Sequence, residues 1–104
     1  MTGTVELSPE ALEQLAELYR YIAHAKSVDV ATRYTDRIIE FCDELGSNPS
    51  RGRRRDDIRP GLRTIGFRRR VLIAFAVVDG TVTVLAIYYG GRDHETLLRD
   101  RPAR

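Results

Sequence analysis

The segment RRRVLIAFAVVDGTVTVLAIYY, residues 68–89, carries the strongest fold signal in the chain. Two runs rich in β-branched and aromatic residues, 68–78 and 81–89, flank the pair Asp79-Gly80. An Asp-Gly pair between two such runs is typical of a tight β-hairpin, because both turn positions favour a positive φ. The sequence therefore predicts an antiparallel hairpin here.

Two shorter strands are predicted on the N-terminal side of this hairpin. TVEL, residues 4–7, alternates and begins with β-branched residues. LRTIGF, residues 62–67, follows the turn signal Pro60-Gly61. Residues 46–61, between the helices and this strand, are predicted to form an arginine-rich connection.

The residues between the first strand and the connection predict two helices. Ser8 is a suitable N-cap, Pro9 suits the first helical position, and Glu10 is favoured by the helix dipole. A helix is expected over residues 9–24, with apolar residues at spacings of three and four. A second periodic segment runs from Val30 to Leu45, and Gly46 followed by Pro49 predicts its end.

The predicted order is β-α-α-β-β-β. Two amphipathic helices joined by a short loop favour an antiparallel helix hairpin, which would cover one face of a small, mostly antiparallel sheet. The expected fold class is therefore α+β. With 104 residues and 42% hydrophobic content, the chain can build one core, so residues 1–104 are expected to form a single domain.

The second face of this sheet is the first functional clue. Strict alternation along the last strand makes both of its faces apolar toward the end, while two helices can cover only one. Either the connection 46–61 and the C-terminal tail cover the other face, or a partner chain does. Alternation puts Val82, Val84, Ala86 and Tyr88 on one face and Thr81, Thr83, Leu85, Ile87 and Tyr89 on the other.

Charge is distributed unevenly along the chain. Residues 1–50 hold four basic and nine acidic side chains, a net −5, and residues 51–104 hold thirteen and six, a net +7, which together give +2. Sixteen of the seventeen basic residues are arginines. Arginine binds phosphates and carboxylates bidentately, so an anion-binding surface is expected. Base composition of the gene is an equally good explanation of the arginine bias.

Several classes of site have no support in the sequence. His24 and His94 are the only histidines, and neither lies in a metal-ligand spacing. The single cysteine, Cys42, excludes a disulfide framework, and its place on an apolar helix face indicates a small buried side chain. We expect no metal and no cofactor. No apolar run is long enough to cross a membrane and no signal pattern begins the chain, so a cytoplasmic location is expected.

A metal-free ribonuclease is one chemistry that the remaining residues could support. Arginines with a tyrosine or histidine could bind a scissile phosphate and stabilise the transition state. His94 is the only candidate general acid or base of ordinary pKa in the basic half, although a free surface imidazole is the simpler interpretation. Spacing alone does not show that the candidates converge. They are Arg63, Arg70, Tyr88, Tyr89, Arg92 and His94.

Four segments together resemble the ParE branch of the RelE/ParE toxin superfamily over nearly the whole chain. They are VELSPEALEQLAELYRYIA (5–23), RYTDRIIEF (33–41), NPSRGRRRDDIRPGLRTI (48–65) and RRRVLIAFAVVDGTVTVLAIYYGGRD (68–93). The resemblance implies the toxin of a type II toxin-antitoxin pair, often a plasmid stabilisation protein, with two N-terminal helices on a small antiparallel sheet. Characterised ParE toxins poison DNA gyrase, whereas RelE-type relatives cleave mRNA on the ribosome.

The resemblance favours the gyrase-poisoning branch, in which the toxin inhibits growth and catalyses no reaction itself. The basic half contains no lysine and the chain has no C-terminal His-Tyr pair, so the residue set of the ribosome-dependent nucleases is incomplete. ParE-like sequences often carry His-Gly where this chain has Tyr89-Gly90, which is a departure from that branch too. If the protein were a metal-free endoribonuclease, its site would be Arg63, Arg70, Tyr89 and His94.

A cognate antitoxin is the partner that the resemblance implies. Such antitoxins are often DNA-binding, and their C-terminal segments wrap the toxin. We expect a toxin-antitoxin hetero-oligomer in which apolar anchors of that segment meet the helix hairpin and sheet and its acidic residues meet arginines. No membrane partner is expected. The expected contact residues are Leu15, Tyr19, Ile22, Tyr34, Arg63, Arg70, Ile73, Phe75, Leu85 and Ile87.

Overall fold

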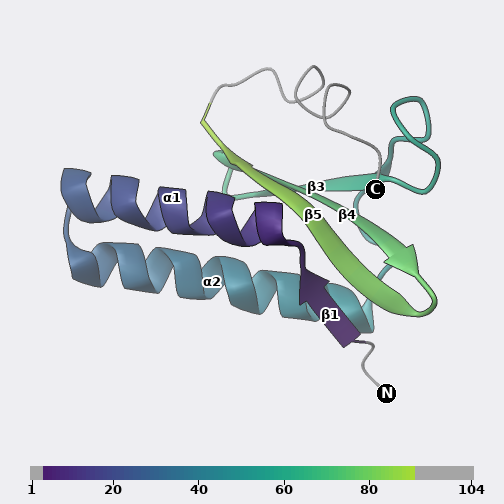
Figure 1. Cartoon of the computed structure of the whole chain (residues 1–104), viewed down its shortest axis with the longest axis horizontal. Coiled ribbons are helices and arrows are strands. Elements are labelled where there is room, and N and C mark those ends of the chain that lie inside the picture. Colours follow the sequence, from purple (N-terminus) through teal and green to yellow (C-terminus); the bar gives the residue numbers. More distant parts are fainter. Residues whose placement is uncertain (1–3, 91–104) are drawn as a thin grey trace.

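The computed structural model describes residues 4–90 and shows two helices packed side by side against one face of a five-stranded sheet (Figure 1). The strand order is β1-β5-β4-β3-β2. Strand β1 pairs with β5 in parallel, and the other neighbours are antiparallel. The predicted α+β class is confirmed. The elements are β1 Thr4–Leu7, α1 Pro9–Ala25, α2 Val28–Ser47, β2 Arg53–Arg54, β3 Arg63–Phe67, β4 Val71–Val78 and β5 Thr81–Tyr89.

The largest differences from the sequence-based boundaries are in α2, at the start of β4 and within the connection. Helix α2 starts earlier than expected because Ser27 caps it, accepting a hydrogen bond from the Val30 amide. It also continues past Gly46, a buried residue, to Ser47. The expected strand over 68–78 begins only at Val71, since the three preceding arginines form a turn. The connection 46–61 contains the short edge strand β2, which the sequence did not indicate.

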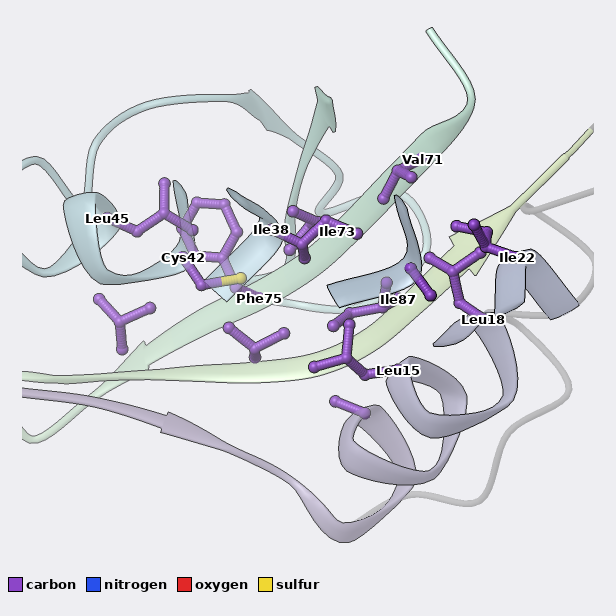
Figure 2. Packing of buried hydrophobic residues seen from close by; sticks show 14 residues of the cluster. Leu15, Leu18, Ile22, Ile38, Cys42, Leu45, Val71, Ile73, Phe75 and Ile87 are labelled. Carbon is purple, nitrogen blue, oxygen red and sulfur yellow. The ribbon is translucent and has the colours of Figure 1, made fainter. Parts of the chain in front are cut away.

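The main core lies between the helix pair and the sheet. Figure 2 shows Leu15, Leu18 and Ile22 of α1 meeting Ile87 of β5, while side chains of α2 meet β4. Phe75, the largest fully buried side chain, is central to this layer. Burial, with a smaller effect from Asp43, raises the pKa of the Cys42 thiol to about 12. Cys42 is 0% exposed, so the prediction of a buried side chain is confirmed.

Strand β5 contains a β-bulge that reverses its alternation. Ala74 of β4 pairs with Ala86 but Phe75 pairs with Val84, so Leu85 is the extra residue. Val84 and Ile87 consequently both face the helices, whereas Ala86 and Tyr88 face the other side. The strict alternation predicted for this strand is therefore wrong beyond Val84.

Ser8 joins the start of α1 to this bulge. Its Oγ accepts a hydrogen bond from the Ala11 amide at 3.1 Å and donates one to the Leu85 carbonyl at 3.0 Å. Its backbone N–H also donates to the Val84 carbonyl at 2.9 Å. The predicted helix cap is confirmed, and the same side chain satisfies a carbonyl that the bulge turns away from β4.

We expect Ser8→Ala to lower the free energy of unfolding by about 2 kcal/mol, because it removes a helix cap and a hydrogen bond to the bulge. Ser27→Ala is the matched control, since Ser27 caps α2 through its bond with Val30. That variant should cost about 1 kcal/mol. Urea denaturation measures both. Equal losses would show that the bond to Leu85 contributes nothing.

The second sheet face is covered in part by the chain itself. Ile58 and Leu62 of the arginine-rich connection and its exit pack on Ala74, Ala86 and Tyr88. Of the two explanations that the sequence left open, this agrees with the one in which the chain covers its own sheet. The C-terminal tail, which that explanation also included, lies outside the described residues. Near the β4–β5 turn, Val77 and Val78 remain exposed.

Candidate functional site

Five aromatic side chains form a continuous row between the helices and one end of the sheet. The rings of Tyr21 and Tyr89 are 5.9 Å apart, and Tyr34 meets Tyr89 edge-on at 6.3 Å. Phe67 continues the row, 6.2 Å from Tyr34 and 5.1 Å from Phe41. Because the rings come from α1, α2, β3 and β5, only the folded chain assembles this aromatic row.

Arginines flank the aromatic row. The guanidinium of Arg51 lies 5.2 Å from the centre of the Phe41 ring, and that of Arg68 lies 5.3 Å from the centre of the Phe67 ring. Burial raises the pKa of Tyr34, and Tyr89 adds to the rise, while the positive charges of Arg68 and Arg70 oppose it. The row is thus an apolar surface with a cationic rim.

The turn between β3 and β4, which we call the arginine turn, consists of Arg68, Arg69 and Arg70. Arg68 and Arg69 have φ values of 52° and 67°. The Arg70 amide donates to the Arg68 carbonyl at 2.7 Å, which closes a γ-turn around Arg69. A γ-turn with positive central φ is the rarer and more strained form, and each such non-glycine residue costs on the order of 1–3 kcal/mol.

Both hairpin turns of the sheet require residues with a positive φ, but they use different residue types. At the β4–β5 turn the positive φ values fall on Asp79 and Gly80, residue types that accept them readily. At the arginine turn the same demand falls on two long cationic side chains. The backbone there gains nothing from arginine, so its presence points to a role of the side chains.

Two arginines of the connection form close ion pairs with carboxylates of the same segment. Arg54 pairs with Asp56 at 3.0 Å, and Arg55 pairs with Asp57 at 2.9 Å. Within residues 4–90, no carboxylate lies within ion-pair distance of the arginine turn, whose three side chains are exposed. Three adjacent, exposed guanidinium groups therefore lie beside the aromatic row.

Of the residues that the sequence suggested for RNA cleavage, the structure places Arg63 apart from Arg70 and Tyr89. Arg63 pairs with Phe75, and its Nη1 donates to the Ser50 carbonyl at 3.0 Å. Arg70 precedes Val71, which pairs with Tyr89. The length of β4 between Phe75 and Val71, on the order of 13 Å, thus separates Arg63 from the other two. His94 lies outside the described residues.

Tyr88 and Tyr89 point to opposite faces because they follow the bulge and alternate. Tyr88 is 4% exposed within the second core cluster, whereas Tyr89 joins the aromatic row. Of the two tyrosines considered from the sequence, Tyr89 is therefore the one beside the arginine turn.

The burial of the expected antitoxin contacts divides them into two groups. Five are largely or fully buried between the helices and the sheet, because the apolar stripes of the helices pack on that sheet face. The bulge turns Ile87 toward the helices as well. The surfaces of these five side chains are therefore not available to a partner. These five are Leu15, Ile22, Ile73, Phe75 and Ile87. Tyr19, Tyr34, Arg63, Arg70 and Leu85 keep accessible surface.

Sequence reasoning missed three members of the aromatic row, Tyr21, Phe41 and Phe67. Tyr21 is 60% exposed and lies off the apolar stripe of α1, which was a readable signal of a surface role. Phe41 and Phe67 gave no such signal, since their ring contacts cross between elements.

Two clefts lie on the described surface. One, about 240 Å³, lies between α1 and the end of β5 and is lined by Gln14, Glu17, Leu18, Tyr21, Ile87 and Tyr89. Another, about 380 Å³, lies on the second sheet face and is lined by Arg59, Pro60, Leu62, Ala76, Val78, Thr83 and Leu85.

Residues 4–90 offer no group of three or more His, Cys, Asp or Glu side chains that could hold a metal ion. None of the helices in that part of the chain combines the length and apolar character needed to cross a membrane.

Two N-terminal helices on a mostly antiparallel five-stranded sheet form an α+β fold of the RelE/ParE type. More narrowly, residues 5–94 match the family described as the ParE toxin of the type II toxin-antitoxin system parDE, and the chain belongs to that family. Toxin ParE1 of Mycobacterium tuberculosis is 29% identical over 93 residues, which is 89% of this chain and 95% of that protein.

Solved structures show the same fold. A chain of the chromosomal ParDE toxin-antitoxin system from P. aeruginosa superposes with a TM-score of 0.75 at 20% identity, covering 86% of this chain and 98% of that one. The toxin-antitoxin complex RelBE2 from Mycobacterium tuberculosis gives 0.60 at 19% identity, covering 86% and 99%. The isolated RelE toxin of E. coli gives 0.57 at 16%, covering 93% and 97%.

Proposed function

We propose that this toxin acts by poisoning DNA gyrase and is neutralised by a cognate antitoxin. The observation that carries the proposal is the match to the ParE family over residues 5–94. The geometry supports it, because Arg63 lies far from Arg70 and Tyr89 and the described residues thus hold no assembled set of RNA-cleaving groups. The toxin then needs no catalytic centre of its own, only a surface that fits its target.

Incubating the purified chain with gyrase, ATP and relaxed plasmid tests this. We expect supercoiling to be inhibited and cleaved plasmid to accumulate, because a poison traps the enzyme after it has cut DNA. Heat-unfolded chain is the control. If neither inhibition nor cleaved DNA appears while gyrase alone remains active, the proposal is wrong.

Cleavage of ribosome-bound mRNA is the second candidate, favoured by the proximity of Arg70 to Tyr89. A toeprinting assay with the same protein preparation decides between the two. The nuclease should cut message at defined codons and lose this activity in Tyr89→Phe, which keeps the ring contacts but removes the hydroxyl. If the message stays uncut while cleaved plasmid accumulates with gyrase, mRNA cleavage is excluded and gyrase poisoning is supported.

The antitoxin segment that we propose is acidic and apolar. Tyr19, Tyr34 and Leu85 lie on different elements, and Leu85 borders the cleft on the second sheet face. A segment that contacts all three must therefore wrap around the toxin. Apolar anchors in the clefts would hold the complex, and carboxylates near Arg63 and Arg70 would speed its formation.

A further inference from the structure

We propose that the arginine turn, residues 68–70, is a contact site for the phosphodiester backbone of a nucleic acid, with the tyrosines of the aromatic row beside it. This goes beyond the proposed function, because it assigns to the toxin a direct affinity for DNA or RNA that requires neither gyrase nor a ribosome. Three observations support it independently.

The first observation is the clustered, exposed charge of the arginine turn. Three consecutive guanidinium groups are exposed, and within residues 4–90 none of them has a carboxylate at ion-pair distance. Arg54 and Arg55 of the connection, in contrast, are paired with Asp56 and Asp57. Like charges held this close repel one another, and a chain of phosphates spaced along a strand relieves that repulsion.

The second observation is the backbone. Arg68 and Arg69 occupy left-handed conformations inside a γ-turn, which favour glycine or asparagine. The closure also fixes the position from which each side chain leaves the backbone. Glycine or asparagine at these positions would avoid the backbone strain. Strain that is retained in this way is typical of sites where the side chains bind a ligand.

The third observation is the neighbourhood. Arg68 lies over Phe67, so part of its side chain is already ordered before any ligand arrives. Arg70 is placed by its carbonyl, which accepts from the Gly90 amide at 2.9 Å, next to Tyr89. Arginine beside accessible aromatic rings is the usual composition of surfaces that bind single strands, where the arginines meet phosphates and the rings meet bases.

An acidic peptide is the competing ligand, and a polyglutamate peptide serves as its probe. Carboxylates and phosphates both take bidentate guanidinium contacts, so the arginines alone do not choose between the two ligands. The neighbouring aromatic rings do, because nucleic-acid bases stack on such rings and acidic side chains do not. The observations therefore favour a nucleic acid, and the peptide becomes an outcome of the test.

The test is fluorescence anisotropy of the full chain with labelled single-stranded DNA, duplex DNA and RNA across a salt series. We expect binding in at least one of the three, with affinity falling as salt rises. The triple variant Arg68→Gln, Arg69→Gln, Arg70→Gln should weaken that binding by about tenfold or more and reduce the salt slope by about 2.

The matched control is Arg20→Gln, Arg33→Gln, Arg37→Gln, which removes the same net charge from exposed helix positions. It should leave the salt slope nearly unchanged. An equal loss in both triple variants would show that only net charge matters and would overturn the proposal. Absence of binding to all three nucleic acids, or binding to polyglutamate alone, would overturn it as well.

A second variant separates binding from folding. Arg68→Asn with Arg69→Gly supplies the residue types that the turn prefers, so its thermal midpoint should rise by about 4 °C. Its nucleic-acid affinity should nevertheless fall, because two guanidinium groups are lost. A purely structural role for these arginines predicts instead a lower midpoint with unchanged affinity, and that result would contradict the proposal. Failure of the gyrase assay would leave each of these measurements interpretable.

Discussion

Replacing Phe75 by alanine should lower the free energy of unfolding by about 3–5 kcal/mol, the range for a large aromatic side chain removed from a core. Phe75 is 0% exposed and lies in the middle of β4, between the helix pair and the neighbouring strands. No other side chain of this size is buried completely among residues 4–90. Its removal would leave a cavity that the surrounding elements cannot all close. Equilibrium denaturation in urea measures the loss.

Val77→Ala is the control in the same strand. Val77 is 43% exposed, so its truncation should cost no more than about 1 kcal/mol. Similar losses in the two variants would show that the layer between α2 and β4 is not the dominant core. A reduced m-value in the Phe75 variant would indicate a loosened native state. The loss of unfolding free energy should then be measured with substitutions at Phe75 that remove less volume.

Gly52→Ala should lower the free energy of unfolding by about 2–4 kcal/mol, since it combines two unfavourable effects. Gly52 has φ of 85°, where a side chain is strained. A Cβ built there would also lie 2.6 Å from the Thr64 carbonyl oxygen, closer than real contacts allow. Edge strand β2 and the preceding loop would have to move away from β3.

Gly61→Ala separates these two effects. Its φ is 81°, nearly the same, but a Cβ added there meets nothing within 4 Å. It should therefore cost only the conformational part, about 1–2 kcal/mol. The difference between the variants in urea denaturation measures the steric part. Equal costs would mean that the loop at Gly52 shifts freely and that β2 contributes little to the sheet.

Much of the fold could be predicted because local chemistry and the final structure agree. The Asp79-Gly80 turn, the Ser8 cap and the apolar spacing of the helices each need only neighbouring residues for their effect. The same reasoning placed one strand start three residues too early, at Arg68. A run of arginines before apolar residues carries no pattern that separates a strand from a turn.

The faces of β5 could not be predicted beyond Val84. The extra residue at Leu85 is accommodated because Ser8, which is distant in sequence, hydrogen-bonds the Leu85 carbonyl. Strict alternation assumes an uninterrupted ladder, so it assigned Ile87 to the wrong face and made it a partner contact. A bulge of this kind has a tertiary cause and leaves no mark in a single sequence.

The candidate site was only partly visible for the same reason. The sequence identified an excess of arginine but did not separate paired side chains from unpaired ones, because pairing depends on which carboxylates the fold brings near. Asp56 and Asp57 pair with Arg54 and Arg55, while the arginine turn lies at the other end of β3 from this connection. The aromatic row joins four elements and could be recognised only in the folded chain.

The parallel pairing of β1 with β5 has a consequence for biosynthesis. Thr4 pairs with Thr81, so the first strand to leave the ribosome has no partner until nearly the whole chain has been made. At about 5–20 residues per second, the two helices wait several seconds with their apolar stripes uncovered. The nascent chain therefore cannot complete its sheet, or bury both helix stripes fully, until β5 has been made.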